Sequence, residues 1–549
     1  MVVLTIGCDS HEESEEAALV NGLPSFKAFV DSLNNADLMV AKWAVNGDSI
    51  VERAALNIDW EKELETLRKS NVNHLRFRDS YTISDSVIGS ERRVSFVAIS
   101  DDQEVQRMEV RLVKGAVIYY AINKANSTLF SSSIIEFEFH PNQYSLKLDQ
   151  KIKWVFDNQQ YVVGNVFPKG TFWRANLQFD DAKCPINFII TENGQLLAKN
   201  GSETVRFSQS ESIEDSLIFH SDNFNSSLVY THVSDNKISG KWINRKKDNA
   251  YSVSFQAIKN TPYRFLVETI PTTNLTGSHT AKFLKPDGEV QETVELRLVQ
   301  NNHIVTGSFL TETGDYRFLE GVVRNDSLLL STMDGTHAYL FQAEIIDQEL
   351  SGVFQTGTGY RQAWKATLNS KPAMRSAEHI TTKHDSIPFS FSFPDSKGNI
   401  VSISDEQFMG KPMIITIMGT WCSNCLDESV FLKEIHELYS EKDLKIVALD
   451  FELVSDSVRA FKNIDRHKQS LGINYPVLLA STKATKKSAS ELLPSLSEVS
   501  SYPTMIFLDR NHEIVRIHTG FSGPAMGRES YDAFRSEYLA LAASLIVKH

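Results

Sequence analysis

The chain has 549 residues, of which 42% are apolar and 23% are charged, and its formal net charge is −13. This length suggests several folded domains, because a single hydrophobic core rarely grows beyond a few hundred residues. The sequence has no basic stripe that would hold a phosphate backbone and no apolar run of about 18 residues. We therefore expect neither a nucleic-acid partner nor a membrane-spanning segment.

The N-terminus contains a short apolar stretch that ends in a cysteine and is followed by acidic residues. The stretch Leu4–Cys8 resembles the end of a bacterial lipoprotein signal, in which a small residue precedes a cysteine that carries a lipid. We expect residues 1–23 to be a signal remnant with an acidic tether, and Cys8 to anchor the protein to a membrane of the bacterial cell envelope. The alternative is a frayed end with a chance cysteine.

The next segment changes from helical to strand-like spacing. Apolar residues at helical spacing predict that Leu23–Trp43 is partly helical, and Asp59 is suited to cap a second helix. Alternation of apolar and polar residues from about residue 93 to 166 is typical of half-buried antiparallel strands. We expect an α+β domain over residues 24–167, with a structural or binding role.

A faint internal repeat occupies the middle of the chain. Its two copies, residues 168–265 and 275–369, share two short motifs at nearly equal separations: Asp215–Ile218 with Ile238–Trp242, and Asp326–Leu329 with Leu350–Phe354. Short alternating strands between Asn, Asp and Gly turns predict two small antiparallel β-barrels or sandwiches. Such barrels are either packed spacers or containers for an apolar ligand.

Two further features separate the repeats from the last domain. Cys184 has no cysteine or histidine close to it in the sequence, so we interpret it as a small buried apolar side chain. Residues 370–384 are polar and lack apolar periodicity, which indicates a linker.

The last domain, residues 385–549, alternates strands and helices and ends with a hairpin and a helix. This order predicts a mixed sheet with helices on its faces. An apolar strand ending at Met418 leads into Cys422-Ser-Asn-Cys425, and a helical pattern follows.

The spacing of the two cysteines has a chemical reason. Cys422 would lie at the first turn of the helix, where free N–H groups and a partial positive charge stabilise a thiolate. Two intervening residues let Cys425 reach back within disulfide geometry. We therefore expect Cys422 to attack a disulfide and Cys425 to resolve the intermediate, while Ser423 and Asn424 help to set the redox potential.

The segment Trp421–Glu428, together with Ser501–Thr504, resembles the TlpA/ResA-like thiol–disulfide oxidoreductases, which have a thioredoxin-like fold. The resemblance implies that Cys422 and Cys425 are the redox pair and that Glu428 is an acidic residue near them. It also implies that Pro503 is a cis-proline facing the cysteines. Trp421, Tyr502 and Thr504 are then supporting residues.

Two details refine this resemblance. The stretch Gly520–Pro524 is similar to family members that carry large N-terminal extensions in Bacteroidetes-type bacteria, and the β-rich extension here looks like theirs. Asn424 stands where many relatives have a proline, which affects the redox potential rather than the chemistry.

Other interpretations of the motif stay open. A structural zinc site normally needs four ligands, and the sequence has no second cysteine pair, so we expect no metal. A thiol peroxidase would have Thr and Pro where this chain has Gly419 and Ile415. Glu428 is alternatively an exposed helix residue. A ligand- or client-binding lipoprotein, in which the β domains carry the main role, is the alternative from another class.

The sequence thus leads to one expected function. The protein reduces disulfides of extracytoplasmic client proteins with no cofactor other than the Cys422–Cys425 disulfide, and an upstream thiol reductant restores the pair.

Overall fold

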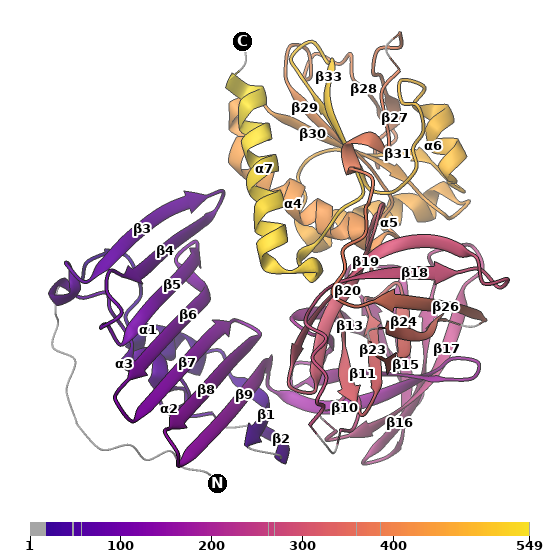
Figure 1. Cartoon of the computed structure of the whole chain (residues 1–549). Helices are drawn as coiled ribbons and strands as arrows, with labels where there is room; N and C mark the ends of the chain where they lie inside the picture. Colours follow the sequence, from indigo (N-terminus) through magenta and orange to yellow (C-terminus); the bar gives the residue numbers. More distant parts are fainter. Residues whose placement is uncertain are drawn as a thin grey trace. The chain divides into compact units, whose positions relative to one another are not determined.

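The structure is a computed structural model that describes residues 18–46, 49–55, 58–261, 263–267, 270–347, 349–357, 359–384 and 386–547 (Figure 1). The chain divides into two compact units, residues 1–47 with 55–168, and residues 169–549 with 48–54. Cys8 lies outside the described residues, so lipid attachment there stays a prediction. No helix within the described ranges is long and apolar enough to span a membrane.

The N-terminal unit is α+β, as expected: it combines short helices with a long antiparallel sheet. Beyond β1 the sheet runs in the order β9-β8-β7-β6-β5-β4-β3. The helical segments are α1 (Phe26–Asn34), α2 (Trp60–Glu63), α3 (Glu65–Lys69) and the 3₁₀ turn η1 (Leu75–Phe77). The strands of this unit are β1 (Leu38–Asn46), β3 (Tyr81–Ile88), β4 (Glu91–Ala98), β5 (Val105–Val113), β6 (Ala116–Ser127), β7 (Ser131–His140), β8 (Gln143–Ile152) and β9 (Phe156–Pro168), while most of β2 (Ser49–Ala55) is assigned to the other unit.

The segment Leu23–Trp43 is partly helical, as the sequence predicted. Ser25 caps α1 by accepting a hydrogen bond from the Ala28 N–H, and the helix ends at Asn34. Trp43, at the end of that segment, lies in β1, directly opposite Val163 of β9. The backbone of β1 pairs with β9, and such pairing between distant segments often decides whether a residue is in a strand, whatever its local sequence favours.

The first repeat is a closed antiparallel barrel made of β10 to β17 in chain order. Its strands are β10 (Gly170–Gln178), β11 (Lys183–Thr191), β12 (Gln195–Asn200), β13 (Glu203–Ile213), β14 (Ser216–Ser221), β15 (Ser226–Ser234), β16 (Lys237–Asn244) and β17 (Tyr251–Lys259). Large side chains such as Phe207, Trp242 and Phe255 fill the interior. Cys184 is buried among them, and burial raises the pKa of its thiol to about 12, which agrees with its interpretation as an apolar core residue.

The second repeat also closes, because β18 pairs with β26 and β19 pairs with β20. Its strands are β18 (Gly277–Leu284), β19 (Val290–Asn301), β20 (Ile304–Thr311), β21 (Gly314–Asp315), β22 (Leu319–Arg324), β23 (Ser327–Met333), β24 (Ala338–Ile346), β25 (Glu349–Thr356) and β26 (Tyr360–Thr367). Phe283, Phe309, Phe341 and Trp364 pack together inside. Both barrel interiors are thus filled by side chains, so neither is a container for an apolar ligand in its core.

The internal repeat seen in the sequence corresponds to equivalent strands. The Ser-Gly motifs fall on β16 and β25, each of which is the strand before the last in its barrel. A Cβ atom at Gly240 would lie 2.2 Å from the carbonyl oxygen of Val229, and one at Gly352 would lie 2.0 Å from that of Gln342. The glycine is therefore required at the same place in both barrels, since the neighbouring strand leaves no room for a side chain.

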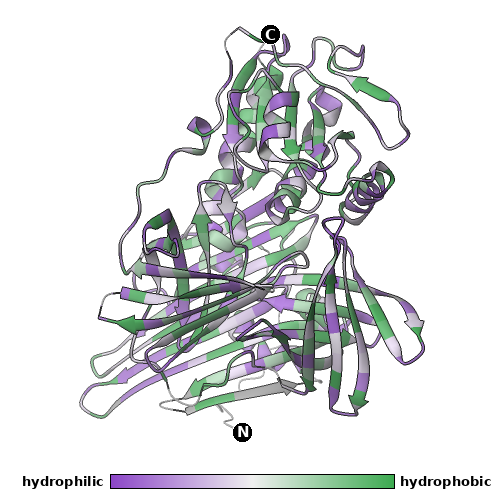
Figure 2. Cartoon of the chain, turned by 90° about the vertical axis from the view of Figure 1, so that its right-hand side faces the viewer, coloured by the Kyte–Doolittle hydropathy of each residue, from purple (hydrophilic) through white to green (hydrophobic). Residues whose placement is uncertain are grey.

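The two barrels share part of their cores. Met333, Ala338 and Leu340 of the second barrel belong to the hydrophobic cluster of the first. The buried Asn244 side chain donates a 2.7 Å hydrogen bond to the Thr336 carbonyl, and so links the barrels through polar groups as well. Apolar and polar residues alternate along these strands (Figure 2).

The C-terminal domain is a five-stranded mixed sheet, order β31-β30-β29-β32-β33 among the described residues, flanked by helices (Figure 1). The strand pairs β29–β30 and β30–β31 are parallel, and β32 is antiparallel to both β29 and β33. The strands are β27 (Ser392–Pro394), β28 (Ile400–Ser402), β29 (Met413–Met418), β30 (Lys445–Phe451), β31 (Val477–Ser481), β32 (Thr504–Leu508) and β33 (Ile514–Thr519). The helices are η2 (Ala377–His379), α4 (Ser423–Tyr439), η3 (Ser440–Lys442), α5 (Ser457–Leu471), α6 (Lys486–Leu492), η4 (Pro524–Met526) and α7 (Arg528–Val547).

Candidate functional site

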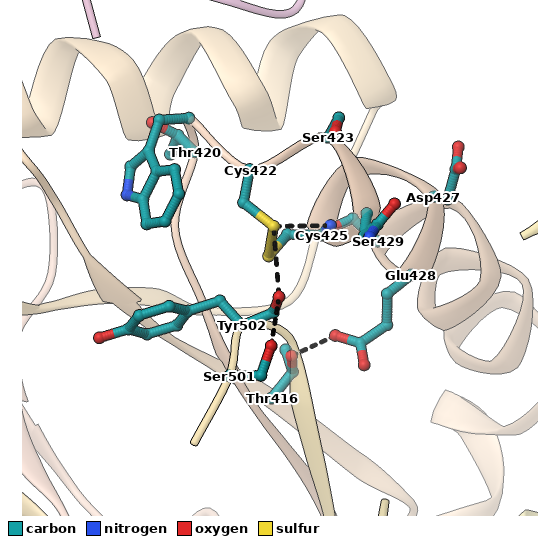
Figure 3. Close-up of a disulfide and its surroundings, with 12 residues drawn as sticks. Thr416, Thr420, Cys422, Ser423, Cys425, Asp427, Glu428, Ser429, Ser501 and Tyr502 are labelled. Carbon is teal, nitrogen blue, oxygen red and sulfur yellow. Dashed lines mark hydrogen bonds between the residues drawn. A yellow bond between two sulfur atoms is a disulfide. The ribbon is translucent and has the colours of Figure 1, made fainter. Parts of the chain in front are cut away.

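The two cysteines lie where the central strand β29 passes into helix α4. Cys422 is the N-cap residue of α4, and it forms a disulfide with Cys425 whose Cα atoms are 5.2 Å apart (Figure 3). The Cys425 backbone N–H points at the Cys422 sulfur, 3.2 Å away. Cys422 is 7% exposed, whereas Cys425 is fully buried. The N-terminal cysteine is therefore the one that a disulfide outside the protein reaches first.

The second predicted element faces this pair. The Tyr502–Pro503 peptide bond is cis, and the Tyr502 carbonyl oxygen lies 3.6 Å from the Cys422 sulfur (Figure 3). Thr504 is buried and its hydroxyl donates a 3.0 Å hydrogen bond to the Ser501 carbonyl, which fixes the loop before β32. The ring of Trp421 packs edge-on against that of Tyr502, and its indole N–H donates to the Phe451 carbonyl.

Glu428 is buried beneath the disulfide, not exposed on the helix surface. It is 0% exposed, and one carboxyl oxygen accepts a hydrogen bond from the Thr416 hydroxyl (Figure 3). The other oxygen has no hydrogen-bond partner in the described part of the chain. Burial raises the pKa of this carboxyl to about 8, while the Thr416 hydrogen bond partly opposes that rise. Glu428 is thus an acid that holds its proton at neutral pH.

Besides Glu428, two buried acidic residues lie at the end of β30, and neither was predicted from the sequence. Asp450 accepts a hydrogen bond from the Thr420 N–H, and Glu452 accepts one from the Thr420 hydroxyl. Burial raises the pKa of both carboxyls, and the charge of Glu452 raises that of Asp450 further. The signal was available, because two acidic residues at the carboxyl end of an apolar strand are unusual.

The second barrel covers the N-terminus of α4. Arg317 is buried, and it forms ion pairs with Asp427 of α4, at 3.0 Å, and with Glu203 of the first barrel. The Asn424 side chain, between the two cysteines, donates a 3.1 Å hydrogen bond to the Asp315 carbonyl. The sequence singled out Asn424 for its effect on the redox potential and as a departure from proline, but it gave no indication of this contact, of Arg317 or of Asp315. The local sequence around residue 317 gives no signal, since its partners lie about 110 residues away on either side.

No cluster of three or more potential metal ligands occurs among the residues that the structure describes. A parallel central strand, a helix that begins at a Cys-x-x-Cys disulfide, and a cis-proline facing that disulfide together define a thioredoxin-like domain. This agrees with the fold class expected for the C-terminal residues.

The C-terminal part of the chain matches a known family and is similar to known proteins. Residues 382–533 match the model of the Redoxin family. The chain is similar to the thiol-disulfide oxidoreductase ResA of Geobacillus kaustophilus, with 25% identity over 130 residues, which are 24% of this chain and 66% of that protein. It is similar to ResA of Bacillus subtilis with 26% identity over 130 residues, 24% of this chain and 64% of that protein. The expected ResA-type resemblance of the C-terminal domain is thereby confirmed, although the chain spans less than two thirds of these relatives' length.

Solved structures of similar description match a part of the chain. A thiol:disulfide interchange protein of the thioredoxin family from Chlorobium tepidum covers 30% of this chain and 99% of its own, with 16% identity and a TM-score of 0.22. A thiol-disulfide oxidoreductase from Bacteroides fragilis covers 26% of this chain and 96% of its own, with 16% identity and a TM-score of 0.20.

Proposed function

We propose that this protein is a thiol–disulfide oxidoreductase that reduces disulfides of extracytoplasmic client proteins through Cys422 and Cys425. The observation that carries the proposal is the disulfide between a slightly exposed Cys422 at the N-terminus of α4 and a fully buried Cys425. Relatives named as thiol-disulfide oxidoreductases support it.

The reaction has two exchange steps. In the reduced protein the Cys422 thiolate attacks one sulfur of the client disulfide, which forms a mixed disulfide and releases the other client sulfur as a thiolate. The Cys425 thiolate then attacks the Cys422 sulfur, re-forms the disulfide bond of the structure and releases the second client thiol. Two electrons pass to the client, and an upstream dithiol must return two electrons to the protein. The partial positive charge at the N-terminus of α4 stabilises the Cys422 thiolate.

Glu428 supplies a proton store for the second step. Cys425 must lose a proton to attack, and it is buried away from water. The charged form of Glu428 accepts this proton: with a pKa near 8 it is the minor form at neutral pH, but it is a stronger base than an ordinary glutamate. We assign Glu428 to this exchange, and Trp421, Tyr502, Pro503 and Thr504 to shaping the surface that Cys422 presents.

The experiment compares the wild type with single cysteine variants. Pre-reduced wild-type protein should reduce 2-hydroxyethyl disulfide, whereas Cys422→Ser should be inactive and Cys425→Ser should accumulate a mixed disulfide visible by mass spectrometry. No reduction by the wild type would overturn the enzyme assignment and favour a binding lipoprotein. Thiol-dependent consumption of hydrogen peroxide in place of disulfide reduction would indicate a peroxidase.

The location is a separate part of the proposal. We place the protein in the bacterial cell envelope, anchored through a lipid on Cys8, on the strength of the Leu4–Cys8 sequence. Detergent phase partition of the protein from its native host tests this. The wild type should enter the detergent phase and Cys8→Ala should stay in the aqueous phase; equal partition would exclude the anchor.

A further inference from the structure

A cavity of about 710 Å³ lies between the mouth of the second barrel and the redox pair. Cys422, Trp421 and Asn424 line it on one side, and residues of the second barrel line most of the other. Cys422 is only 7% exposed and lines this cavity, so the cavity is a route by which a disulfide approaches its sulfur. Residues that line the cavity therefore contact a client that approaches by this route.

Hydrogen bonds hold the barrel side of the cavity to the segment that contains Cys422. Asn424 is held by the Asp315 carbonyl, and the Thr336 hydroxyl donates a 3.2 Å hydrogen bond to the Trp421 carbonyl. Arg317 donates a 2.7 Å hydrogen bond to the Ser423 carbonyl. These three contacts join the segment 421–424 to the barrel, so the distance between Cys422 and the cavity wall is set by the fold.

The wall itself is aromatic. The ring centroids of Tyr316, Tyr339 and Phe354 lie 5.4 to 5.6 Å from one another. Tyr360 extends this cluster at 5.9 Å from Phe354, and it is 48% exposed at the rim. Aromatic rings packed at such distances offer faces and edges on which another aromatic side chain stacks favourably.

A cation lies among the lining residues. Lys246 has no ion-pair partner within the described ranges, although Asp334 is near enough to favour its charged form. His337, another lining residue, is already paired with Asp334 at 3.1 Å. Lys246 is half-buried, and partial burial lowers the pKa of its ammonium to about 8, so a carboxylate that entered the cavity would stabilise the charged form.

We propose that this cavity binds an extended segment of the client beside its disulfide, with an aromatic side chain against Tyr316, Tyr339, Phe354 and Tyr360 and a carboxylate at Lys246. This inference rests on the function proposed above and names its substrate class. A disulfide that lies flat on a folded client does not reach Cys422, because the sulfur is recessed behind the barrel mouth. Unfolded or extended clients with an acidic and an aromatic residue near the cysteine are preferred.

The test uses short peptides with one cysteine in a mixed disulfide with thionitrobenzoate, whose release is coloured. Pre-reduced protein is mixed with each peptide in single-turnover experiments, so no external reductant is needed. A peptide with Phe and Asp beside the cysteine should react at least about tenfold faster, as the second-order rate constant, than one with Gly and Asn, since each good contact in a pocket is worth roughly tenfold or more.

Single substitutions show which residues of the cavity produce the preference for Phe and Asp. Tyr360→Ala should remove most of the advantage of Phe, and Lys246→Met most of the advantage of Asp. Ile346→Ala and Lys241→Met are the controls, because both residues are exposed on barrel strands outside the cavity. Both control variants should reduce 2-hydroxyethyl disulfide at the wild-type rate and keep the wild-type preference between the peptides, and the urea unfolding midpoint of each variant checks that its fold is intact.

The outcomes separate the two proposals. Equal rates for both peptides, with normal reduction of 2-hydroxyethyl disulfide, would overturn the substrate inference and leave the proposed function standing. A preference that survives in both Tyr360→Ala and Lys246→Met would overturn the assignment to this cavity. Failure of the wild type on every disulfide would overturn the proposed function itself.

Discussion

Arg317 of the second barrel donates a 2.7 Å hydrogen bond to the backbone carbonyl of Ser423, the residue that follows the first redox cysteine. The same guanidinium pairs with Asp427 one turn further along α4 and with Glu203 of the first barrel. One buried cation therefore connects both barrels to the start of the redox helix.

Replacing Arg317 by Met should lower the stability of the protein substantially. The change leaves Asp427 and Glu203 buried without their cation, and breaking a buried ion pair typically costs about 3–5 kcal/mol. Urea unfolding, followed by tryptophan fluorescence, measures the loss.

Arg361→Met is the matched control, because the ion pair of Arg361 with Asp181 is exposed on both sides. Such a surface pair contributes about 0–1 kcal/mol. Similar small losses in both variants would show that the Arg317 cluster does not hold the barrels to the redox domain.

Gly314→Ala should destabilise the contact between the barrel and the redox pair. Gly314 has φ +136°, and a Cβ atom there would lie 2.1 Å from the Asn424 side-chain nitrogen. Gly288→Ala is the control, since Gly288 also has a positive φ, +87°, but its Cβ would meet nothing within 4 Å. Both variants carry a backbone strain of about 1–3 kcal/mol, so an additional loss in Gly314→Ala measures the clash. Equal unfolding midpoints would contradict the contact.

Glu428 should make the protein less stable as the pH rises. Burial raises the pKa of its carboxyl from 4.5 to about 8, so between these values the folded protein binds the proton more tightly than the unfolded chain. The free energy of unfolding therefore falls as pH increases through this window, by up to about 1.4 kcal/mol per pH unit. In Glu428→Gln this fall should be shallower by the contribution of one carboxyl, since Asp450 and Glu452 keep their raised pKa values, whereas Glu441→Gln, at an exposed position, should behave as the wild type. Parallel stability curves for Glu428→Gln and wild type would refute the assignment.

Thr416→Val should raise the pKa of the Glu428 carboxyl further. The Thr416 hydroxyl donates to the Glu428 carboxyl and favours its charged form, so removing the hydroxyl raises the pKa of Glu428 further. The infrared band of the protonated carboxyl is followed as the pH is raised, and its midpoint gives the pKa of Glu428. Glu428→Gln lacks this band and so identifies it. A midpoint that stays in place or falls would show that Thr416 does not control this carboxyl.

The local part of the site could be predicted from the sequence, because its chemistry depends on residues that are near one another in the chain. Cys422, Cys425 and Glu428 all lie within two turns of one helix, and the strand before it is recognisable from its apolar run. Only Pro503 needed a second segment, and the family resemblance supplied it. The internal repeat also led to the correct fold class for both barrels.

Other features depend on pairing between distant segments, which local patterns do not encode. Trp43 belongs to a strand because β9, more than a hundred residues later, pairs with it. The burial of Glu428 depends on Thr416 and on packing against the sheet, and a helical pattern alone does not reveal it. Arg317 and the cavity arise where a barrel meets the redox helix, a contact that neither segment indicates by itself.

Residues from two distant stretches of the chain line the cavity. Residues 421–428 hold the reacting sulfurs and the proton store, while residues 316–360 of the second barrel provide the aromatic wall. Under the two proposals, electron transfer and the aromatic part of client choice are encoded in different stretches of sequence. An engineer could redirect the protein to new clients by redesigning a barrel mouth while leaving every atom of the disulfide exchange unchanged.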